Sequence, residues 1–292
     1  MNRTFFGEIV RRVDPGFRLA AYAPVTGGCI HEAWQVTGGS RRYFVKTAEA
    51  ARLPMFAAEA EGLRALAETK AVRVPAVRDW GCLDGKAFLI LEWLPLTCRD
   101  GDADARLGER LARLHQVPQP RYGWPCDNFI GATPQPNGFA DDWIAFWRRR
   151  RLGYQLALAA RRGYGGKIQE LGECLLVNLD ALFSGHRLVP SLLHGDLWSG
   201  NAAALPEGDP VVYDPACYWG DREADVAMTE LFGGFDARFH AAYRAAWPLD
   251  PGYPVRRDLY NLYHVLNHLN LFGDSYRRQA EVLLARLVAE IR

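Results

Sequence analysis

The chain has few lysines, no long apolar run and almost no net charge. Lysine occurs only at positions 46, 70, 86 and 167 of the 292 residues, and Lys plus Arg total 35 against 34 Asp plus Glu. Such a balance gives the molecule no overall field that would attract nucleic acid or an anionic membrane. No stretch approaches the roughly 18 apolar residues of a transmembrane helix, and the first eight residues lack the apolar core of a secretion signal. We therefore expect a cytoplasmic protein with a small-molecule or protein partner, and no nucleic-acid or membrane partner.

Other common site signatures are missing as well. None of the six cysteines forms the C-x-x-C pair of a structural zinc site, and no G-x-x-x-x-G-K-[ST] motif of a P-loop NTPase occurs. In a reducing compartment the cysteines should be free thiols. The sequence thus predicts neither a disulfide framework nor a zinc domain.

The first third of the chain reads as strands and turns. Residues 30–36 alternate apolar and polar side chains, residues 37–40 form a glycine-rich turn, and residues 42–46 return as a second strand. A helix with an apolar stripe begins near Leu53, and further strands follow up to Leu91. This pattern predicts a small antiparallel sheet with one main helix.

The pattern changes after Trp93, where polar and turn-forming residues indicate a connection. We therefore predict an α+β fold of two lobes, a small N-terminal lobe of residues 1–93 and a larger, mostly helical lobe of residues 94–292. Helical spacing of apolar residues recurs over residues 103–115, 141–160, 168–183 and 258–272, and a further helix reaches the C-terminus.

The strongest local signal lies in residues 192–201, where an apolar strand leads into His194-Gly195-Asp196 and Asn201 follows five residues after the Asp. This is the spacing of a kinase catalytic loop, in which the Asp accepts the proton of the acceptor hydroxyl and the Asn completes a magnesium shell. A second carboxylate, Asp214, ends a short apolar strand eighteen residues after Asp196. A hairpin of this length would bring Asp214 near Asp196, where it could hold the metal that bridges the nucleotide phosphates.

Each of these pieces has a plainer interpretation when taken alone. The segment at His194 could be a turn, and Asp214 could be a solvated or capping residue. A metallophosphoesterase also uses Asp, His and Asn, but it needs several further His ligands after the Asn. Only His240, His264 and His268 follow, and none is predicted at the end of a strand.

The N-terminal part of the chain contains residues that could bind the phosphates of a nucleotide. The turn Thr26-Gly27-Gly28-Cys29 can bring backbone N–H groups to a phosphate, and Lys46 in the next strand would reach the α and β phosphates. Glu59 on the following helix can pair with Lys46. A Gly-Gly turn alone is most often just a hairpin, but its order before a strand lysine and a helical glutamate favours a nucleotide site.

With these residues identified, the chain resembles kinases of the protein-kinase-like fold, including aminoglycoside phosphotransferases, and more closely the fructosamine kinase (ketosamine 3-kinase) family. The most specific motif is H-G-D-L-W-x-G-N at residues 194–201. The segments that carry the resemblance are 27–30, 43–47, 194–201, 214–216, 220–228, 231–235 and 262–273.

The resemblance implies ATP-dependent phosphorylation of the sugar 3-hydroxyl of a ketosamine, either a small molecule or a glycated protein lysine. The phosphorylated adduct of this family breaks down, so the activity removes the sugar. By position, Asp196 becomes the proton acceptor, with Trp198 and His194 binding substrate. The remaining expected roles are Gly27, Gly28, Cys29, Lys46 and Glu59 for the nucleotide phosphates, the backbone of Glu92, Trp93 and Leu94 for the adenine, and Asn201 and Asp214 for Mg²⁺.

Three alternatives remain open from the sequence. A kinase of the same fold could act on an aminoglycoside, choline or a sugar; a polycationic aminoglycoside would need carboxylates, and Asp100, Asp102 and Asp104 form the one candidate cluster. A nucleotide-binding pseudokinase is disfavoured because Lys46 and Asp196 are intact, as are Asn201 and Asp214. Cys29 could be a redox-sensitive thiol or a small residue in a tight turn, so both a monomer and a redox-linked dimer fit.

Overall fold

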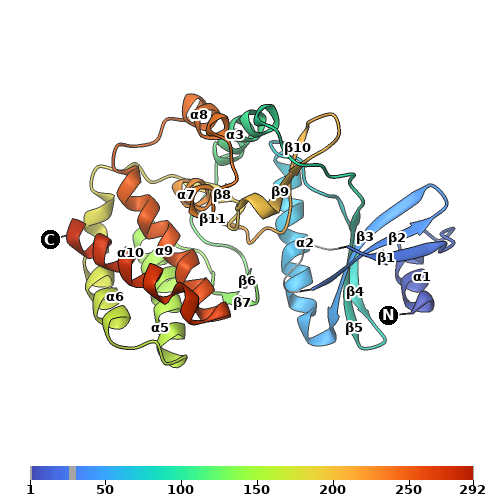
Figure 1. The fold of residues 1–292 in the computed structure, drawn as a ribbon, viewed down its shortest axis with the longest axis horizontal. Coiled ribbons are helices and arrows are strands. Elements are labelled where there is room, and N and C mark those ends of the chain that lie inside the picture. Colours follow the sequence, from blue (N-terminus) through green and yellow to red (C-terminus); the bar gives the residue numbers. More distant parts are fainter. Residues whose placement is uncertain (1, 26–30, 292) are drawn as a thin grey trace.

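A five-stranded antiparallel sheet forms the N-terminal lobe of the computed structural model, which describes residues 2–25 and 31–291 (Figure 1). Its strand order is β1-β2-β3-β5-β4, so the β2–β3 hairpin lies next to the β4–β5 hairpin. Gly39 has φ +62°, and Asp84 and Gly85 have φ +49° and +74°, the left-handed backbone that two-residue hairpin turns require. The strands are β1 (Ala21–Pro24), β2 (Glu32–Gly38), β3 (Arg41–Glu49), β4 (Val77–Leu83) and β5 (Lys86–Glu92).

The two faces of this sheet are covered by different helices. Because side chains alternate along a strand, Phe88 and Ile90 of β5 face α1 (Arg3–Arg11), while Leu89 and Leu91 face the opposite side. That side packs against α2 (Leu53–Glu68), which has a proline in its first turn, where no N–H is needed. Helix α2 is the predicted main helix; α1 is additional and lacks any predicted counterpart in the sequence analysis.

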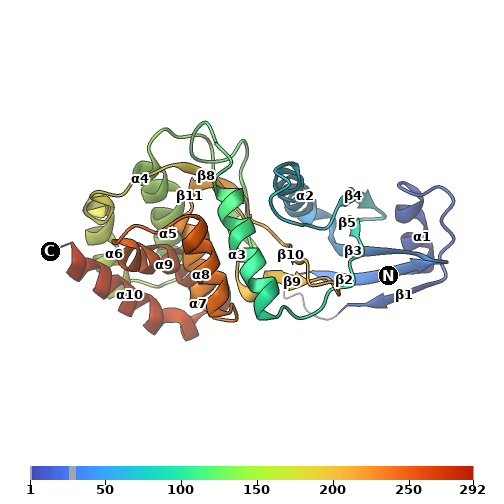
Figure 2. The same ribbon diagram turned by 90° about the horizontal axis from the view of Figure 1, so that it is seen from above.

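The remaining chain forms a mostly helical C-terminal lobe in which only short strands occur. Helices α3 and α8 lie side by side, and α3 is the one nearer the N-terminal lobe (Figure 2). The elements are α3 (Gly101–His115), β6 (Asn128–Ile130), β7 (Thr133–Gln135), α4 (Trp143–Phe146), a π-helical turn (Trp147–Leu152), α5 (Gly153–Arg161), α6 (Lys167–Val177), β8 (Pro190–Leu193), β9 (Ala202–Ala204), β10 (Pro210–Val212), β11 (Tyr218–Asp221), α7 (Glu223–Leu231), α8 (Ala237–Ala246), α9 (Tyr253–Phe272) and α10 (Arg277–Glu290), with 3-10 turns at Ala50–Arg52, Leu179–Phe183, Ser199–Asn201 and Asp274–Tyr276.

The helix predictions hold in position and differ in detail. The helix predicted over 141–160 is interrupted by the π-helical turn, and the one predicted over 168–183 ends at Val177. Helix α9 begins at Tyr253, before the predicted start, because Gly252 and Pro254 form its first turn. Among the described residues, no helix is long and apolar enough to cross a bilayer.

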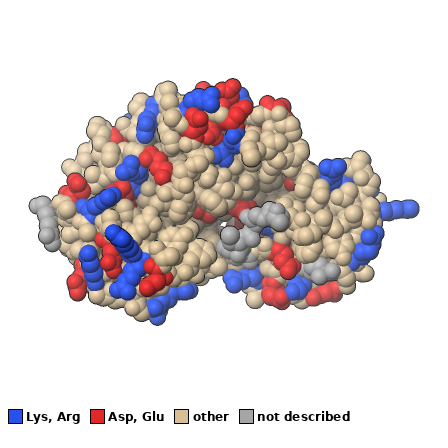
Figure 3. All heavy atoms as spheres, in the orientation of Figure 1, with Lys and Arg blue, Asp and Glu red and all other residues tan. Residues whose placement is uncertain are grey.

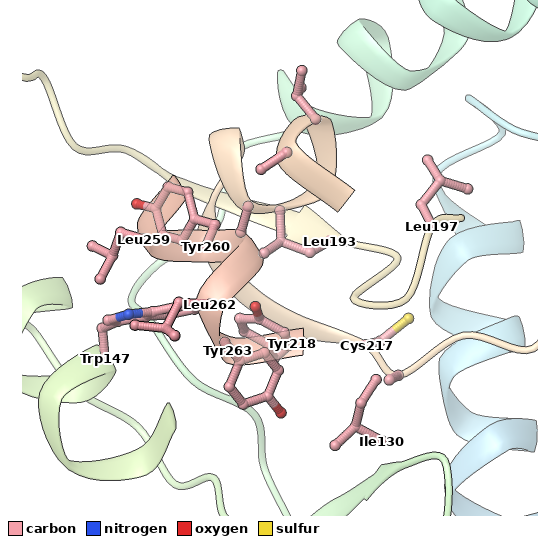
Figure 4. Packing of buried hydrophobic residues seen from close by; sticks show 14 of the residues in the cluster. Ile130, Trp147, Leu193, Leu197, Cys217, Tyr218, Leu259, Tyr260, Leu262 and Tyr263 are labelled. Carbon is pink, nitrogen blue, oxygen red and sulfur yellow. The ribbon is translucent and has the colours of Figure 1, made fainter. Parts of the chain in front are cut away.

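One apolar core runs across the junction between the lobes. A methyl group on Gly62 of α2 would lie 3.2 Å from both Pro215 Cγ and Cys217 Sγ, so glycine allows the helix to approach the chain just after Asp214. Figure 4 shows the Cys217 sulfur pointing toward the α2 ribbon, with Tyr260 and Tyr263 of α9 further inside the C-terminal lobe. Helix α2 is therefore packed against both lobes.

Candidate active site

The segment with Asp196 leaves β8 and is held against the chain after β10. The Ala216 N–H donates to the His194 carbonyl oxygen at 2.8 Å. Gly195 lies between them with φ +81°, and a Cβ there would stand 2.1 Å from the Ala216 oxygen. Only glycine fits, which explains the Gly of the H-G-D motif.

Asn201 lies beside Asp196, as the five-residue spacing predicts. Its Nδ2 donates to the Asp196 backbone oxygen at 2.9 Å and approaches the Asp196 carboxylate at 3.3 Å. The Tyr213 N–H donates to the Asn201 carbonyl oxygen at 3.0 Å, which ties this loop to the residue before Asp214. Asp196, Asn201 and Asp214 therefore meet in one place.

Asp196 has the electrostatics of a proton acceptor. Burial, followed by the negative charge of Asp214, raises the pKa of Asp196 to about 7. The Asn201 amide opposes this shift by donating to the carboxylate. A carboxylate with a pKa near neutrality binds a proton far better than an ordinary Asp and is still ionised in a substantial fraction of molecules.

Lys46 joins the two lobes at the same place. Its Nζ lies 2.8 Å from Glu59 Oε1 and 2.6 Å from Asp214 Oδ1. Burial alone would lower the pKa of Lys46, but the two carboxylates raise it, so the lysine is charged. Burial raises the pKa of Glu59 to about 7, against the attraction of Lys46. The predicted Lys46–Glu59 pair is thus present, with Asp214 as a third member.

Asp214 adopts an unusual backbone conformation. Its φ of +56° lies in the left-handed region, which costs a non-glycine residue roughly 1 kcal/mol or more and commonly occurs at functional sites. Its side chain is 44% exposed, and Oδ1 is bonded to Lys46 while Oδ2 accepts no hydrogen bond from the described residues. The strained backbone therefore presents a free carboxylate oxygen between the lobes. Atoms of Asp and Glu residues, in red, are visible in the hollow between the lobes in Figure 3.

These oxygens fit a magnesium ion. Mg²⁺ prefers carboxylate and amide oxygens in an octahedral shell completed by water and phosphate oxygens. Because the Asn201 amide nitrogen is turned toward Asp196, its Oδ1 is left for another partner, as is Asp214 Oδ2. Asp214 and Asn201 are the residues that would hold the ion.

The position of His194 requires a correction of the sequence-based prediction. This side chain was expected to bind substrate, but it is 1% exposed. Its Nε2 lies 3.0 Å from the Tyr213 carbonyl oxygen, and its Nδ1 accepts the Asp196 N–H at 3.3 Å. Both ring nitrogens are used within the protein, so His194 shapes the loop around Asp196 and does not reach a substrate.

Asp225, on α7, holds the loop from behind. Its Oδ2 accepts the His194 N–H at 2.7 Å and its Oδ1 accepts the Gly195 N–H at 2.8 Å. The ring of His115 approaches the same carboxylate at 3.2 Å. Although burial works to raise the pKa of Asp225, these donors lower it. The resemblance implied that the stretch from Asp221 to Asp225 tethers this loop, and the hydrogen bonds of Asp225 to His194 and Gly195 form such a tether.

Arg99 is a further positioning residue that the sequence analysis missed. Its guanidinium donates to the backbone oxygens of Ser199 and Ala202, at the two ends of the turn with Asn201, and to Gly234. It forms a buried ion pair with Asp104. One arginine therefore fixes the catalytic loop and the loop after α7, and no local pattern signals this role.

Glu92, the first residue of the segment expected to bind adenine, already forms hydrogen bonds within the protein. The Glu92 N–H donates to the Ala76 carbonyl oxygen at 2.8 Å, and its carboxylate binds Arg73 at 2.7 Å and the Ala76 N–H at 3.0 Å. Trp93 and Leu94 follow directly after β5. If this segment holds a base, Trp93 and Leu94 are better placed than Glu92 to offer a backbone N–H.

Three other predicted residues, Gly27, Gly28 and Cys29, lie outside the described residues. Trp198 is described and is 38% exposed, and a methyl group on Gly200 would stand 2.2 Å from its ring. The ring of Trp198, two residues after Asp196, thus lies against Gly200, and it also contacts Phe232. Its role as a platform for the substrate stays an expectation.

The acidic cluster that an aminoglycoside site would need is engaged elsewhere. Asp104 is bound to Arg99, Asp100 caps the start of α3 by accepting the Ala103 N–H, and Asp102 pairs with Arg238. Each of the three carboxylates already has a partner within the protein, and Asp104 is also buried. The geometry therefore does not favour the aminoglycoside alternative.

Comparison with known proteins identifies the family of the chain. The family model described as fructosamine kinase matches residues 1–290. A probable ketoamine kinase of Synechocystis is 45% identical over 283 residues, covering 97% of this chain and 95% of the other. The solved structure of a presumed fructosamine-3-kinase from Haemophilus somnus has a TM-score of 0.88 at 30% identity, covering 96% of each chain.

The wider fold is that of the aminoglycoside phosphotransferases. The enzyme APH(4)-Ia, in a complex with ADP and hygromycin B, matches with a TM-score of 0.67 at 14% identity, over 97% of this chain and 98% of that one. The predicted α+β, protein-kinase-like fold is thereby confirmed. Since the family model and the Synechocystis relative both extend over nearly the whole sequence, the chain belongs to the fructosamine kinase family.

Proposed function

We propose that this protein is an ATP-dependent kinase that phosphorylates the 3-hydroxyl of ketosamines, the sugar adducts of amines. The observation that carries the proposal is Asp196, a half-buried carboxylate with a pKa of about 7 beside Asn201 and within reach of the charge of Asp214. Membership in the fructosamine kinase family supports the ketosamine as substrate. We further propose that residues 1–93 bind the nucleotide and residues 94–292 supply the acceptor site.

In the proposed reaction Asp196 accepts the proton of the sugar 3-hydroxyl as that oxygen bonds to the γ-phosphorus. The bond from the γ-phosphorus to the β–γ bridging oxygen breaks, and ADP leaves with its electron pair. Phosphoryl transfer requires little covalent help, so positioning and charge neutralisation supply most of the rate. Lys46, held by Glu59, would bind phosphate oxygens, and Mg²⁺ on Asp214 and Asn201 would neutralise charge that develops on them.

The proposed function is tested by measuring ATP consumption with Mg²⁺ against a ribulosamine, a fructosamine, an aminoglycoside and choline, with phosphorus NMR on each product. We expect phosphate on the 3-hydroxyl of a ketosamine and none on the other two compounds. Absence of turnover with both ketosamines, despite ATP binding measured by calorimetry, would overturn the proposal. Phosphate on an aminoglycoside or choline instead would identify another acceptor for the same machinery.

Replacing Lys46 by Met should weaken the productive use of ATP while the protein still folds. The side chain keeps its length but loses the charge that faces Asp214 and Glu59, so kcat/KM for ATP should fall by roughly 10²- to 10³-fold. Initial rates across a range of ATP concentrations measure this. Lys86→Met is the matched control, because Lys86 pairs with Glu49 between β5 and β3 of the same sheet but on the surface. An unchanged ATP dependence for Lys46→Met would contradict the assigned role.

A further inference from the structure

Five aromatic rings extend from the catalytic loop over the surface of the C-terminal lobe. Trp198 contacts Phe232 after α7, with ring centroids 6.4 Å apart, and Phe232 contacts His268 of α9 at 5.1 Å. His268 in turn contacts Phe272 at 5.4 Å and Tyr276 at 5.0 Å. We call these five side chains the aromatic strip.

The strip is open to solvent. Trp198, Phe232 and Phe272 are 38%, 41% and 55% exposed, and they are among the few large apolar side chains with such exposure in the described residues. Single exposed apolar residues are common, but rings that contact one another in a row beside a reactive group usually mark a binding surface. Such a surface offers apolar area and ring faces to a ligand.

The strip is also held in place. The His268 Nδ1 lies 2.8 Å from the His264 carbonyl oxygen one turn earlier, which fixes the ring in its orientation. Burial lowers the pKa of His268, so the ring is neutral near pH 7. The loop after Phe232 is bound by Arg99 through Gly234. The His268 ring and the loop after Phe232 are therefore held in place, which lowers the conformational entropy lost when a ligand packs on the strip.

The geometry of a ketosamine places its amine side near this surface. The amine nitrogen is attached two carbons away from the carbon that bears the 3-hydroxyl, so a sugar that presents this hydroxyl to Asp196 carries its amine substituent close by. Trp198, two residues after Asp196, is the first ring of the strip. The strip continues from there along α9, whose rise of about 1.5 Å per residue carries it from His268 to Phe272 over about 6 Å.

We propose that the aromatic strip binds the amine-side substituent of the ketosamine and favours aromatic substituents over short hydrophilic ones. This inference rests on the proposed function and adds a selectivity that sugar recognition alone would not give. The side chains of the strip carry no charge that would compensate a buried ionic group. An aromatic substituent, in contrast, gains contact with Phe232 and Phe272.

The test compares two adducts of the same ketose, one formed with phenethylamine and one with ethanolamine. For the unaltered protein we expect kcat/KM to be roughly tenfold higher for the phenethylamine adduct, as for a partly buried aromatic ring. Phe232→Ser, Phe272→Ser and the double variant should bring this ratio progressively toward one. Val177→Ser is the matched control, because Val177 is 76% exposed at the end of α6 and outside the strip.

Two results would overturn the inference: equal kcat/KM for both adducts in the unaltered protein, or an unchanged ratio in the double variant. Calorimetric titration with the same adducts distinguishes this failure from failure of the proposed function. Preferential binding of the phenethylamine adduct that is lost in the double variant, without phosphate transfer, would support the strip and overturn the kinase activity. Phosphate transfer to both adducts without preference would support the kinase activity and overturn the role of the strip.

Discussion

Asp196→Ala is expected to lower kcat by roughly 10²- to 10⁴-fold, the usual contribution of a positioned general base, while ATP still binds. The side chain is the one acid whose pKa is raised to about 7 beside Asn201. Lys46, Glu59 and Asp214 are untouched by the change, so calorimetric affinity for ATP should stay within a few-fold of the unaltered protein. Steady-state turnover of a ketosamine measures the loss.

The stability of this variant gives an independent check. An Asp whose pKa is higher in the folded state than its ordinary value of 3.8 contributes its full stabilisation below pH 3.8, and this contribution is lost progressively as the pH rises from 3.8 through about 7. At pH 8 the ionised carboxylate opposes folding, so Asp196→Ala should melt at the same temperature or higher. Asp180→Ala, at an exposed ion pair with Arg148, should leave turnover unchanged. Near-normal turnover in Asp196→Ala would rule out its role as the base.

Asp225→Ala should damage both stability and turnover, although Asp225 touches no substrate. The change leaves the N–H groups of His194 and Gly195 and the ring of His115 without their buried acceptor. Burying such groups unpaired costs about 1–3 kcal/mol each, so we expect a loss of about 3 kcal/mol in the free energy of unfolding after relaxation. For a chain of this size that is a fall in Tm of roughly 6–12 °C. Scanning calorimetry and ketosamine turnover measure the two effects.

The stability that Asp225 contributes should depend on pH, and two further variants serve as controls. Because donors lower the pKa of Asp225 in the folded state, its stabilisation is present above the ordinary value of 3.8 and is lost as the pH falls through the lower, folded value. Asp225→Asn keeps one acceptor oxygen and should be intermediate. Asp102→Ala, which removes an exposed ion pair with Arg238, should change neither Tm nor turnover. A stable, active Asp225→Ala protein would show that the loop around Asp196 is held by other contacts.

The residues that form the reacting cluster could be predicted because they follow one another at short, fixed spacings. Asp196 and Asn201 share one loop, and Asp214 returns on the following hairpin, so local geometry alone brings them together. The pair of Lys46 and Glu59 could be predicted because a strand and the next helix form a single unit of the N-terminal sheet. The metal, nucleotide and proton-transfer roles of these residues stay predictions.

What the sequence could not supply depends on contacts between distant segments. Arg99 reaches backbone oxygens 100 and 103 residues away, and backbone acceptors leave no trace in a pattern of side chains. His194 was expected to bind substrate because it stands in the same motif as Asp196, yet tertiary packing buries it. The π-helical turn at Trp147–Leu152 was read as ordinary helix because its apolar residues still recur at helical spacing.

The apolar core that crosses the lobe junction has a consequence for how the molecule denatures. One face of the sheet, helix α2 and the interior of the C-terminal lobe belong to a single cluster of buried side chains. Two domains with separate cores melt independently, whereas a shared core must be opened in both at once. Thermal unfolding is therefore expected to be one cooperative transition, in which a nucleotide bound near Lys46 raises the melting temperature of the helices around α9 as much as that of the sheet.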